Sequence, residues 1–222
     1  MRILFKFATR SRPALFARGM RSIIENCVSD NYHILVSVDD DDTTMGRNFE
    51  YPNTTIVSKT SKNKIDAINR DMALASDWDI LVNMSDDMVF TKKGFDNIIR
   101  EAFVEDFHGG NDGDTWERLD LCLHFPDGNR NDLITMAIMG RTYFYRFNYI
   151  YHPDYKSLWC DNEMTDVAKQ LGCYKYVNEK IVEHRHPAYK KGVMDAQYIK
   201  TESFMGVDQQ TYNKRKANNF DL

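Results

Sequence analysis

Short apolar segments alternate with amphipathic segments over the first 90 residues, and this alternation limits the possible folds more than any other feature of the chain. Four apolar segments have the length and composition of buried strands: 3–8, 33–38, 54–58 and 78–84. Two segments between them, 14–28 and 64–75, carry apolar residues every three or four positions, as amphipathic helices do. Strands joined through helices at this spacing predict βαβ units, and hence an α/β fold with a mostly parallel central sheet.

The second half of the chain is less regular. We expect helices at 94–107 and 161–171, a polar helix near the C-terminus, a loop at 108–116, and strands at 119–125, 133–140 and 174–183. The later strands would form a small antiparallel extension of the sheet. Since neither a linker nor an internal repeat interrupts residues 1–222, the sequence predicts a single domain.

The composition excludes several classes of protein. Of the 222 residues, 42% are hydrophobic and 28% are charged, which is typical of a folded globular protein and excludes a low-complexity chain. No run approaches the roughly 18 apolar residues that a membrane-spanning helix needs. The start MRILFKFATRSRP places Lys6 inside its apolar run and lacks a small-residue cleavage site, so we expect no signal peptide and a cytoplasmic location. The four cysteines are far apart, which predicts free thiols.

Two acidic runs each follow directly on a predicted strand. They are the four aspartates at 39–42 and the pair Asp86 and Asp87. Because ligands bind beyond the carboxyl ends of parallel strands, both runs should lie on one binding edge of the sheet. Adjacent carboxylates repel each other unless a cation or hydrogen-bond donors offset the repulsion, so Ser85, Asp86 and Asp87 predict a site for Mg²⁺ or Mn²⁺. An acidic turn or a helix N-cap is the alternative.

His184 and His186 follow the strand predicted at 174–183 and come just before Pro187. Either imidazole could complete a metal site with Asp87, since imidazole and carboxylate both bind divalent cations. The alternative for each histidine is a purely structural role.

Two carboxylates open the helix predicted at 161–171. Asp161 could act as a general base that removes a proton from an attacking hydroxyl, and Glu163 could orient Asp161 or hold the acceptor. Alternatively, Asp161 is the N-cap of this helix, a position that favours aspartate.

Basic side chains are concentrated near the N-terminus. Residues 1–35 carry six basic and two acidic side chains, whereas residues 36–120 carry nine and nineteen. Four basic residues fall in predicted loops at the edge that carries the acidic runs: Arg10, Arg12, Lys62 and Lys64. Their donors could bind a diphosphate, and a cation between that diphosphate and the aspartates would account for both charge clusters. Solvated surface charge is the alternative.

Taken in order, these motifs resemble a GT-A-fold glycosyltransferase of the family 2 type. The matching segments are ATRSRP (8–13), VSVDD (36–40), KNKIDAIN (62–69), ILVNMSDDMVF (80–90), WCDNEMTDVAKQLG (159–172) and EHRHP (183–187). The resemblance covers roughly residues 2–190. It implies a nucleotide-sugar-binding half at 1–90 and an acceptor and catalytic half at 91–190, followed by a helical tail at 191–222.

The resemblance also implies roles for individual residues. Asp39 would contact the nucleoside, and Asp86 the ribose or the sugar. Asp87 would bind the metal on the diphosphate, within a DXD element whose first position is Ser85 here, and His184 or His186 would complete the metal site. Asp161 would be the catalytic base beside Cys160, which stands where many members have glutamate. The donor-binding residues implied in this way are Thr9, Arg10, Arg12, Asp39, Lys64, Asn69, Ser85 and Asp86.

The implied activity is inverting transfer of a hexose-type sugar from a nucleoside-diphosphate sugar to a hydroxyl acceptor, with Mn²⁺ or Mg²⁺ as the cofactor. The acceptor would be a glycan, a small molecule or a modified nucleic acid. A nucleotidyltransferase of related fold is one alternative, but it would normally carry a glycine-rich loop where ATRSRPALFARG offers only Gly19. A non-catalytic module that binds sugar or nucleic acid is the other.

Overall fold

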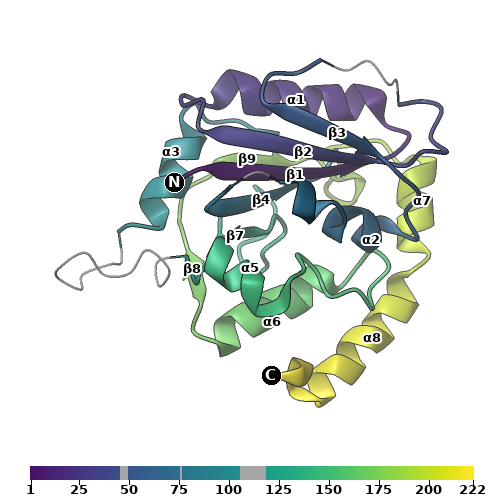
Figure 1. Cartoon of the computed structure of the whole chain (residues 1–222). Helices are drawn as coiled ribbons and strands as arrows, with labels where there is room; N and C mark the ends of the chain where they lie inside the picture. Colours follow the sequence, from purple (N-terminus) through teal and green to yellow (C-terminus); the bar gives the residue numbers. More distant parts are fainter. Residues whose placement is uncertain (46–49, 76, 106–118) are drawn as a thin grey trace.

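A seven-stranded, mostly parallel sheet forms the centre of the molecule (Figure 1). The computed structural model describes residues 1–45, 50–75, 77–105 and 119–222. The strand order is β3-β2-β1-β4-β7-β6-β8. In that order the strands are Thr54–Ser58, Tyr32–Val38, Ile3–Thr9, Ile80–Met84, Ile138–Gly140, Cys122–His124 and Tyr174–Tyr176. The first four strands are parallel, β7 is antiparallel to both of its neighbours, and β8 is parallel to β6.

A second, two-stranded antiparallel sheet pairs β5 (Met88–Phe90) with β9 (Val182–His184). The register places Met88 opposite His184, so a strand late in the chain lies next to the residues that follow β4. The predicted parallel sheet with an antiparallel extension is therefore confirmed, and a small separate sheet is added to it.

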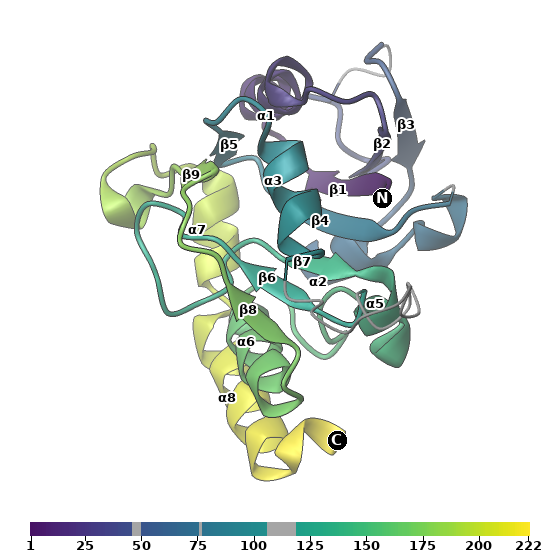
Figure 2. The ribbon, with the colours of Figure 1, turned by 90° about the vertical axis from the view of Figure 1, so that its left-hand side faces the viewer.

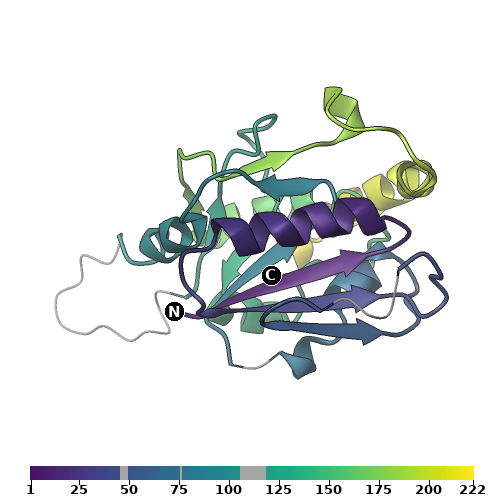
Figure 3. The same cartoon turned by 90° about the horizontal axis from the view of Figure 1, so that it is seen from above.

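Helices cover both faces of the central sheet. On one face lie α1 (Pro13–Asn26) and α3 (Phe95–Ala102) (Figure 3). Their buried apolar residues share a core cluster with alternate residues of β1, including Phe5 and Phe7. On the other face lie α2 (Lys64–Asn69), α5 (Arg141–Phe147) and α6 (Cys160–Gln170), which share a core cluster with Leu4. This division follows from the period of two along a strand, since successive side chains of β1 enter opposite layers.

The C-terminal tail consists of α7 (Ala196–Glu202), α8 (Met205–Ala217) and a short 3₁₀ turn, η3 (Asn219–Asp221). Helix α7 crosses the carboxyl ends of the parallel strands, at the right of Figure 1. Helix α8 continues beside α6, as Figure 2 shows from the side. The tail is thus part of the folded unit, and it reaches the edge where the sequence predicts binding.

Several element predictions were wrong in their extent, among them the strand predicted at 119–125, of which β6 keeps only Cys122–His124, and the helix predicted at 94–107, since α3 ends at Ala102. The helix predicted at 64–75 stops at Asn69, because Asp71 takes a positive φ of 68° before a 3₁₀ turn, η1 (Met72–Leu74). The segment 174–183 is not one strand: the backbone N–H of Val177 bonds to His124, after which the chain leaves the sheet and enters β9. The strand predicted at 133–140 is reduced to its last three residues.

The remaining predictions concern the cysteines, the loop at 108–116 and membrane-spanning helices. All four cysteines are buried free thiols, as predicted. The loop predicted at 108–116 lies outside the described residues. No helix in the described parts of the chain is long and apolar enough to cross a membrane. The 3₁₀ turn η2 (Pro187–Tyr189) follows β9 directly.

Candidate active site

A cavity of about 320 Å³ lies at the carboxyl ends of β1, β2 and β4. Its walls include Thr9 at the end of β1, Asp39 after β2, and Asp86 and Asp87 after β4. The first turns of α2 and α6 line it as well, and α7 contributes side chains from the tail. The two acidic runs thus meet at one edge of the sheet, as the order of strands and helices predicts.

Some buried polar atoms of the cavity lining have no hydrogen-bond partner among the described residues. Six buried side-chain atoms in it have no hydrogen-bond partner of good geometry among the described residues: Thr9 Oγ1, Asp39 Oδ1, Asn83 Oδ1, Asp86 Oδ1, Asp87 Oδ1 and Ser157 Oγ. Buried polar atoms in folded proteins are nearly always hydrogen-bonded, because leaving one unpaired costs about 1–3 kcal/mol. The concentration of such atoms in one cavity indicates a site built to bind a polar ligand.

Asp86 and Asp87 follow each other in the turn between β4 and β5, where the N–H of Met88 bonds to the Ser85 carbonyl. Burial raises the pKa of Asp86 to about 7, against the opposing effects of Thr9 and of Arg12, which lies 4.0 Å away. Burial would also raise the pKa of Asp87, but the hydrogen bond and charge of His184 hold it well below the usual range. The pair thus combines one carboxyl that titrates near neutral pH with one that stays ionised.

His184 lies between two carboxylates. Its Nε2 is 3.2 Å from Asp87 Oδ2, and its Nδ1 is 3.1 Å from Oδ2 of Asp127, a fully buried residue. Burial lowers the pKa of His184, but the two carboxylates outweigh it and raise the pKa to about 9. His186 lines the same cavity, and its ring packs edge-on against Tyr198 with centroids 4.8 Å apart.

The donor set at Asp87 suits a hard divalent cation. The described residues contain no cluster of three or more His, Cys, Asp or Glu side chains arranged around one point. Two donors are nevertheless adjacent, since Asp87 has one unpartnered oxygen and its other oxygen lies beside His184 Nε2. A carboxylate and an imidazole fit Mn²⁺ or Mg²⁺ when a bound diphosphate and water supply the remaining oxygen ligands.

The N-terminal arginines are already paired with carboxylates. Arg10 Nη1 is 2.6 Å from Asp39 and 2.5 Å from Asp41, and these two hydrogen bonds raise the pKa of Arg10. Arg12 makes two hydrogen bonds to Asp195, of 2.9 and 2.7 Å, and its guanidinium lies 3.9 Å from the ring centroid of Tyr198. Arg12 therefore attaches the tail to the cavity wall as well as facing Asp86.

Lys62, Lys64 and Ser85 also line the cavity. Lys64 is the first residue of α2, whose N-cap Asn63 accepts a hydrogen bond of 2.9 Å from the Asp66 N–H. The N-terminus of α2 and two lysines thus face the same space as the acidic pair. Positive charge and unpaired N–H groups at a helix start favour an anionic ligand there.

Asp161 lies in the first turn of α6 and lines the cavity. The helix begins one residue earlier than predicted, with Trp159 as its N-cap, so Asp161 does not have the capping role that was the alternative. Burial raises the pKa of Asp161. Among the described parts of the chain, the side chain of Asp161 accepts one hydrogen bond, of 3.0 Å, from the adjacent Asn162 N–H.

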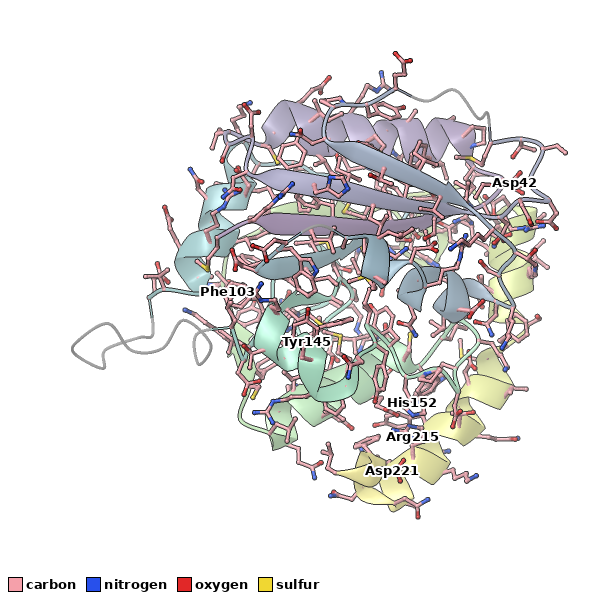
Figure 4. The ribbon with its side chains drawn as sticks, viewed as in Figure 1. Asp42, Phe103, Tyr145, His152, Arg215 and Asp221 are labelled. Carbon is pink, nitrogen blue, oxygen red and sulfur yellow. The ribbon has the colours of Figure 1, made fainter. Side chains whose placement is uncertain are left out.

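Two of the candidate residues lie elsewhere. Glu163 is buried and accepts hydrogen bonds from Arg215 Nε (2.8 Å) and from the Tyr155 hydroxyl (2.7 Å), outside the lining of the cavity. Residues two apart on a helix are separated by roughly 200° of rotation, so Glu163 cannot share the direction of Asp161. Figure 4 shows Arg215 next to Asp221, well away from Asp42 at the strand ends.

Asn69 is the second candidate that lies outside the lining. Its side chain accepts hydrogen bonds from the N–H groups of Ile150 (2.9 Å) and Tyr151 (3.1 Å) and donates one to the Tyr151 carbonyl (2.6 Å). The amide therefore holds the backbone at Ile150 and Tyr151 against α2. Tyr151 in turn lines the cavity, so Asn69 supports the wall without facing the ligand space.

Four residues at or beside the cavity were not predicted from the sequence. Asp127 contacts His184, and Tyr198 donates a 2.8 Å hydrogen bond to Asp87 Oδ2. Asn83 and Ser157 contribute unpartnered polar atoms to the cavity. Asp127 lies in a turn-like stretch, FPDGNRND, and Tyr198 in the polar tail, so neither occupies a local pattern that indicates a site.

Solved structures of known proteins share this fold. The mannosyltransferase PcManGT from Pyrobaculum calidifontis, solved with GDP-Man and Mn²⁺, is 13% identical with a TM-score of 0.56, over 97% of this chain and 73% of that one. S. aureus TarS is 12% identical with a TM-score of 0.59; the match covers 82% of this chain but only 36% of TarS. Glucosyl-3-phosphoglycerate synthase from Mycobacterium tuberculosis, solved with Mn²⁺, UDP-Glc and phosphoglyceric acid, is 16% identical with a TM-score of 0.51, over 90% and 78%.

No protein-family model matches the sequence, and the search of curated proteins finds no relative. The similarity to the solved structures therefore rests on tertiary structure. At sequence identities of 12–16% it shows a shared fold and nothing finer. The chain has the GT-A fold, as its motifs lead one to expect.

Proposed function

We propose that this chain is a metal-dependent glycosyltransferase that moves a sugar from a nucleoside-diphosphate sugar to a hydroxyl acceptor with inversion. The observation that carries the proposal is the cavity at the strand ends, where six buried polar atoms lack partners beside the paired Asp87 and His184. The fold supports it, since PcManGT and the mycobacterial synthase were solved with a sugar nucleotide and Mn²⁺.

The nucleotide would lie along the ends of β1, β2 and β4. Asp39 would bind the nucleoside through its unpartnered oxygen, while Arg10 offsets its charge. Lys64 and the first turn of α2 would face the diphosphate. Asp86, with a pKa of about 7, carries a proton part of the time at neutral pH, so it can donate to a ribose or sugar hydroxyl as well as accept from it.

Asp87 and His184 would hold the divalent cation. When bound, the cation would neutralise negative charge on the departing nucleoside diphosphate. Tyr198 now donates to the oxygen of Asp87 that faces His184, so its hydroxyl would have to turn away or bind the same ligand. His186, whose ring lies 5.4 Å from that of His184, borders the site.

Asp161 would act as the general base. It would take the proton of the acceptor hydroxyl as that oxygen bonds to the anomeric carbon and the bond from this carbon to the diphosphate oxygen breaks. A raised pKa strengthens a carboxylate as a proton acceptor, and burial supplies that shift at Asp161. Attack opposite to the leaving group inverts the anomeric centre.

Calorimetry tests the proposal directly. UDP, GDP and other nucleoside diphosphates would be titrated into the wild type with and without Mn²⁺, and into Asp87→Ala. We expect one nucleotide to bind in a Mn²⁺-dependent way to the wild type and to lose that dependence in Asp87→Ala. Asp132→Ala, which removes a carboxylate that is 70% exposed, is the matched control and should bind as the wild type does. If no nucleotide binds the wild type, the transferase proposal fails.

A further inference from the structure

We propose that Asp127 is a positioning residue that selects the ring nitrogen with which His184 meets the metal. The inference rests on the proposed function, because it assigns His184 to the cation held with Asp87. Asp127 follows β6 in the chain and is fully buried, although it belongs to a loop. It lies on the far side of the imidazole from Asp87.

The carboxylate of Asp127 accepts four hydrogen bonds within its own surroundings. Oδ1 accepts from the backbone N–H groups of Asn129 and Arg130, both at 2.8 Å. Oδ2 accepts from the Thr135 hydroxyl at 2.9 Å and faces His184 Nδ1 at 3.1 Å. In addition, the Asp127 carbonyl accepts the His184 backbone N–H at 3.0 Å, which fixes the strand end that carries the imidazole.

These contacts determine which way each hydrogen bond runs. Because an ionised carboxylate only accepts, His184 must donate from Nδ1 to Asp127. In the metal-free site Nε2 faces the second carboxylate, Asp87. A cation bound at Asp87 would take the place of the proton on Nε2, while the proton on Nδ1 stays on the hydrogen bond to Asp127. Carboxylate–histidine–metal arrangements work in this way, with the outer carboxylate orienting the ring and setting its tautomer.

Asp127→Asn reverses this arrangement with little change of shape. The amide oxygen must take the place of Oδ1, since an NH₂ group cannot face the two backbone N–H groups. The NH₂ group then faces His184 Nδ1, which becomes an acceptor and moves the ring proton to Nε2. The Thr135 hydroxyl can rotate to accept, so the loop keeps its hydrogen bonds. The metal-facing nitrogen of His184 is thereby blocked.

The experiment measures Mn²⁺ affinity by electron paramagnetic resonance, with Mn²⁺ alone and with UDP or GDP present. We expect Asp127→Asn to weaken Mn²⁺ binding on the order of 10- to 100-fold. Asp132→Asn, an exposed aspartate of the same loop, should keep the affinity of the wild type. In a His184→Ala background the Asp127→Asn change should have no further effect, a result that general loss of structure would not produce.

A second measurement uses the unchanged protein. In ¹⁵N spectra of the wild type with Mg²⁺ and the same nucleotide, Nδ1 of His184 should remain protonated and Nε2 should not. Equal Mn²⁺ affinity of the wild type and Asp127→Asn, or a proton on Nε2, would overturn the role of Asp127 while leaving the donor site intact. If the wild type itself binds neither Mn²⁺ nor nucleotide, both proposals fall.

Discussion

At the scale of single residues, neighbouring side chains of like chemistry behave differently because their surroundings differ. Asp86 and Asp87 are adjacent, yet their pKa values shift in opposite directions. Burial prevails at Asp86, whereas at Asp87 the hydrogen bond and charge of His184, together with smaller contributions, outweigh the effect of burial. Asp161 and Glu163 are two residues apart, yet one faces the cavity and the other a buried arginine. Sequence motifs name the residue types of a site, whereas the role of each residue follows from its contacts.

The proposed base gives a prediction at this scale. Asp161→Asn should lower the rate of sugar transfer by about 10²- to 10⁴-fold, because the amide cannot accept the proton of the acceptor hydroxyl. Nucleotide affinity, measured by calorimetry, should change little. Asp154→Asn, a carboxylate that is 66% exposed, serves as the control. A mutant that transfers sugar at the wild-type rate would exclude Asp161 as the base.

Lys6 gives a second residue-scale prediction, on stability. It is fully buried in β1, donates hydrogen bonds to Ser37 and to the Ala67 carbonyl, and has a pKa that burial lowers from 10.5 to about 7. Between pH 7 and 10.5 the unfolded chain therefore binds more protons at this site than the folded one. The free energy of unfolding contributed by Lys6 should rise with pH across this window, by at most about 1.4 kcal/mol per pH unit.

Urea denaturation at pH 7, 8 and 9 measures this contribution. Wild type and Lys6→Met share the other titrating groups, so the difference between their unfolding free energies isolates the lysine. We expect the wild type to gain on Lys6→Met as the pH rises. Parallel pH profiles would show that Lys6 has the same proton affinity in the folded and unfolded chain.

At the scale of elements, the tail is joined to the site through one aspartate of α8. Asp208 is fully buried and accepts hydrogen bonds from three consecutive backbone N–H groups, those of Lys156, Ser157 and Leu158, at 2.8 to 2.9 Å. This loop lines the cavity and leads directly into α6, which carries Asp161. Helix α8 thereby holds this part of the cavity wall in place.

The prediction for this element concerns both stability and activity. Asp208→Ala should lower the free energy of unfolding on the order of 3 kcal/mol, because three N–H groups lose a charged acceptor. Asp208→Asn keeps one acceptor oxygen and should have a smaller effect. Urea denaturation gives both values, and transfer should fall in the same order as the loop loosens. An Asp208→Ala protein as stable as the wild type would show that α8 does not hold the loop.

At the scale of the whole molecule, the site is assembled from distant parts of the chain. The N-terminal half supplies the strand ends, β9 supplies His184, and the tail supplies Tyr198 and the Asp195 that pairs with Arg12. Figures 1 and 2 show α7 and α8 along one side of the molecule, from the strand ends to the base of α6. Residues 197–204 of the tail therefore form part of the cavity wall, a role that the polar sequence of the tail does not indicate.

The sequence alone was enough to predict the βαβ order, the edge of the sheet at which the cavity lies, and most of the acidic and basic residues that line this cavity. These are local properties of the sequence. The spacing of apolar residues distinguishes a strand from a helix, and the carboxyl ends of parallel strands necessarily lie at the same edge of a sheet. The prediction that Glu163 acts beside Asp161 was wrong, because helical rotation turns the two side chains in different directions.

Which of these side chains contact one another depends on the tertiary fold and could not be predicted from the sequence. Pairing of β5 with β9 brings His184 to Asp87 across 97 residues, and the loop after β6 brings Asp127 to the other side of the ring. Likewise, Arg215 draws Glu163 into a buried ion pair, and α7 places Tyr198 on Asp87. Such contacts depend on complementary packing between segments far apart in the chain. They therefore cannot be predicted from the local periodicity of apolar residues or from the spacing of motifs.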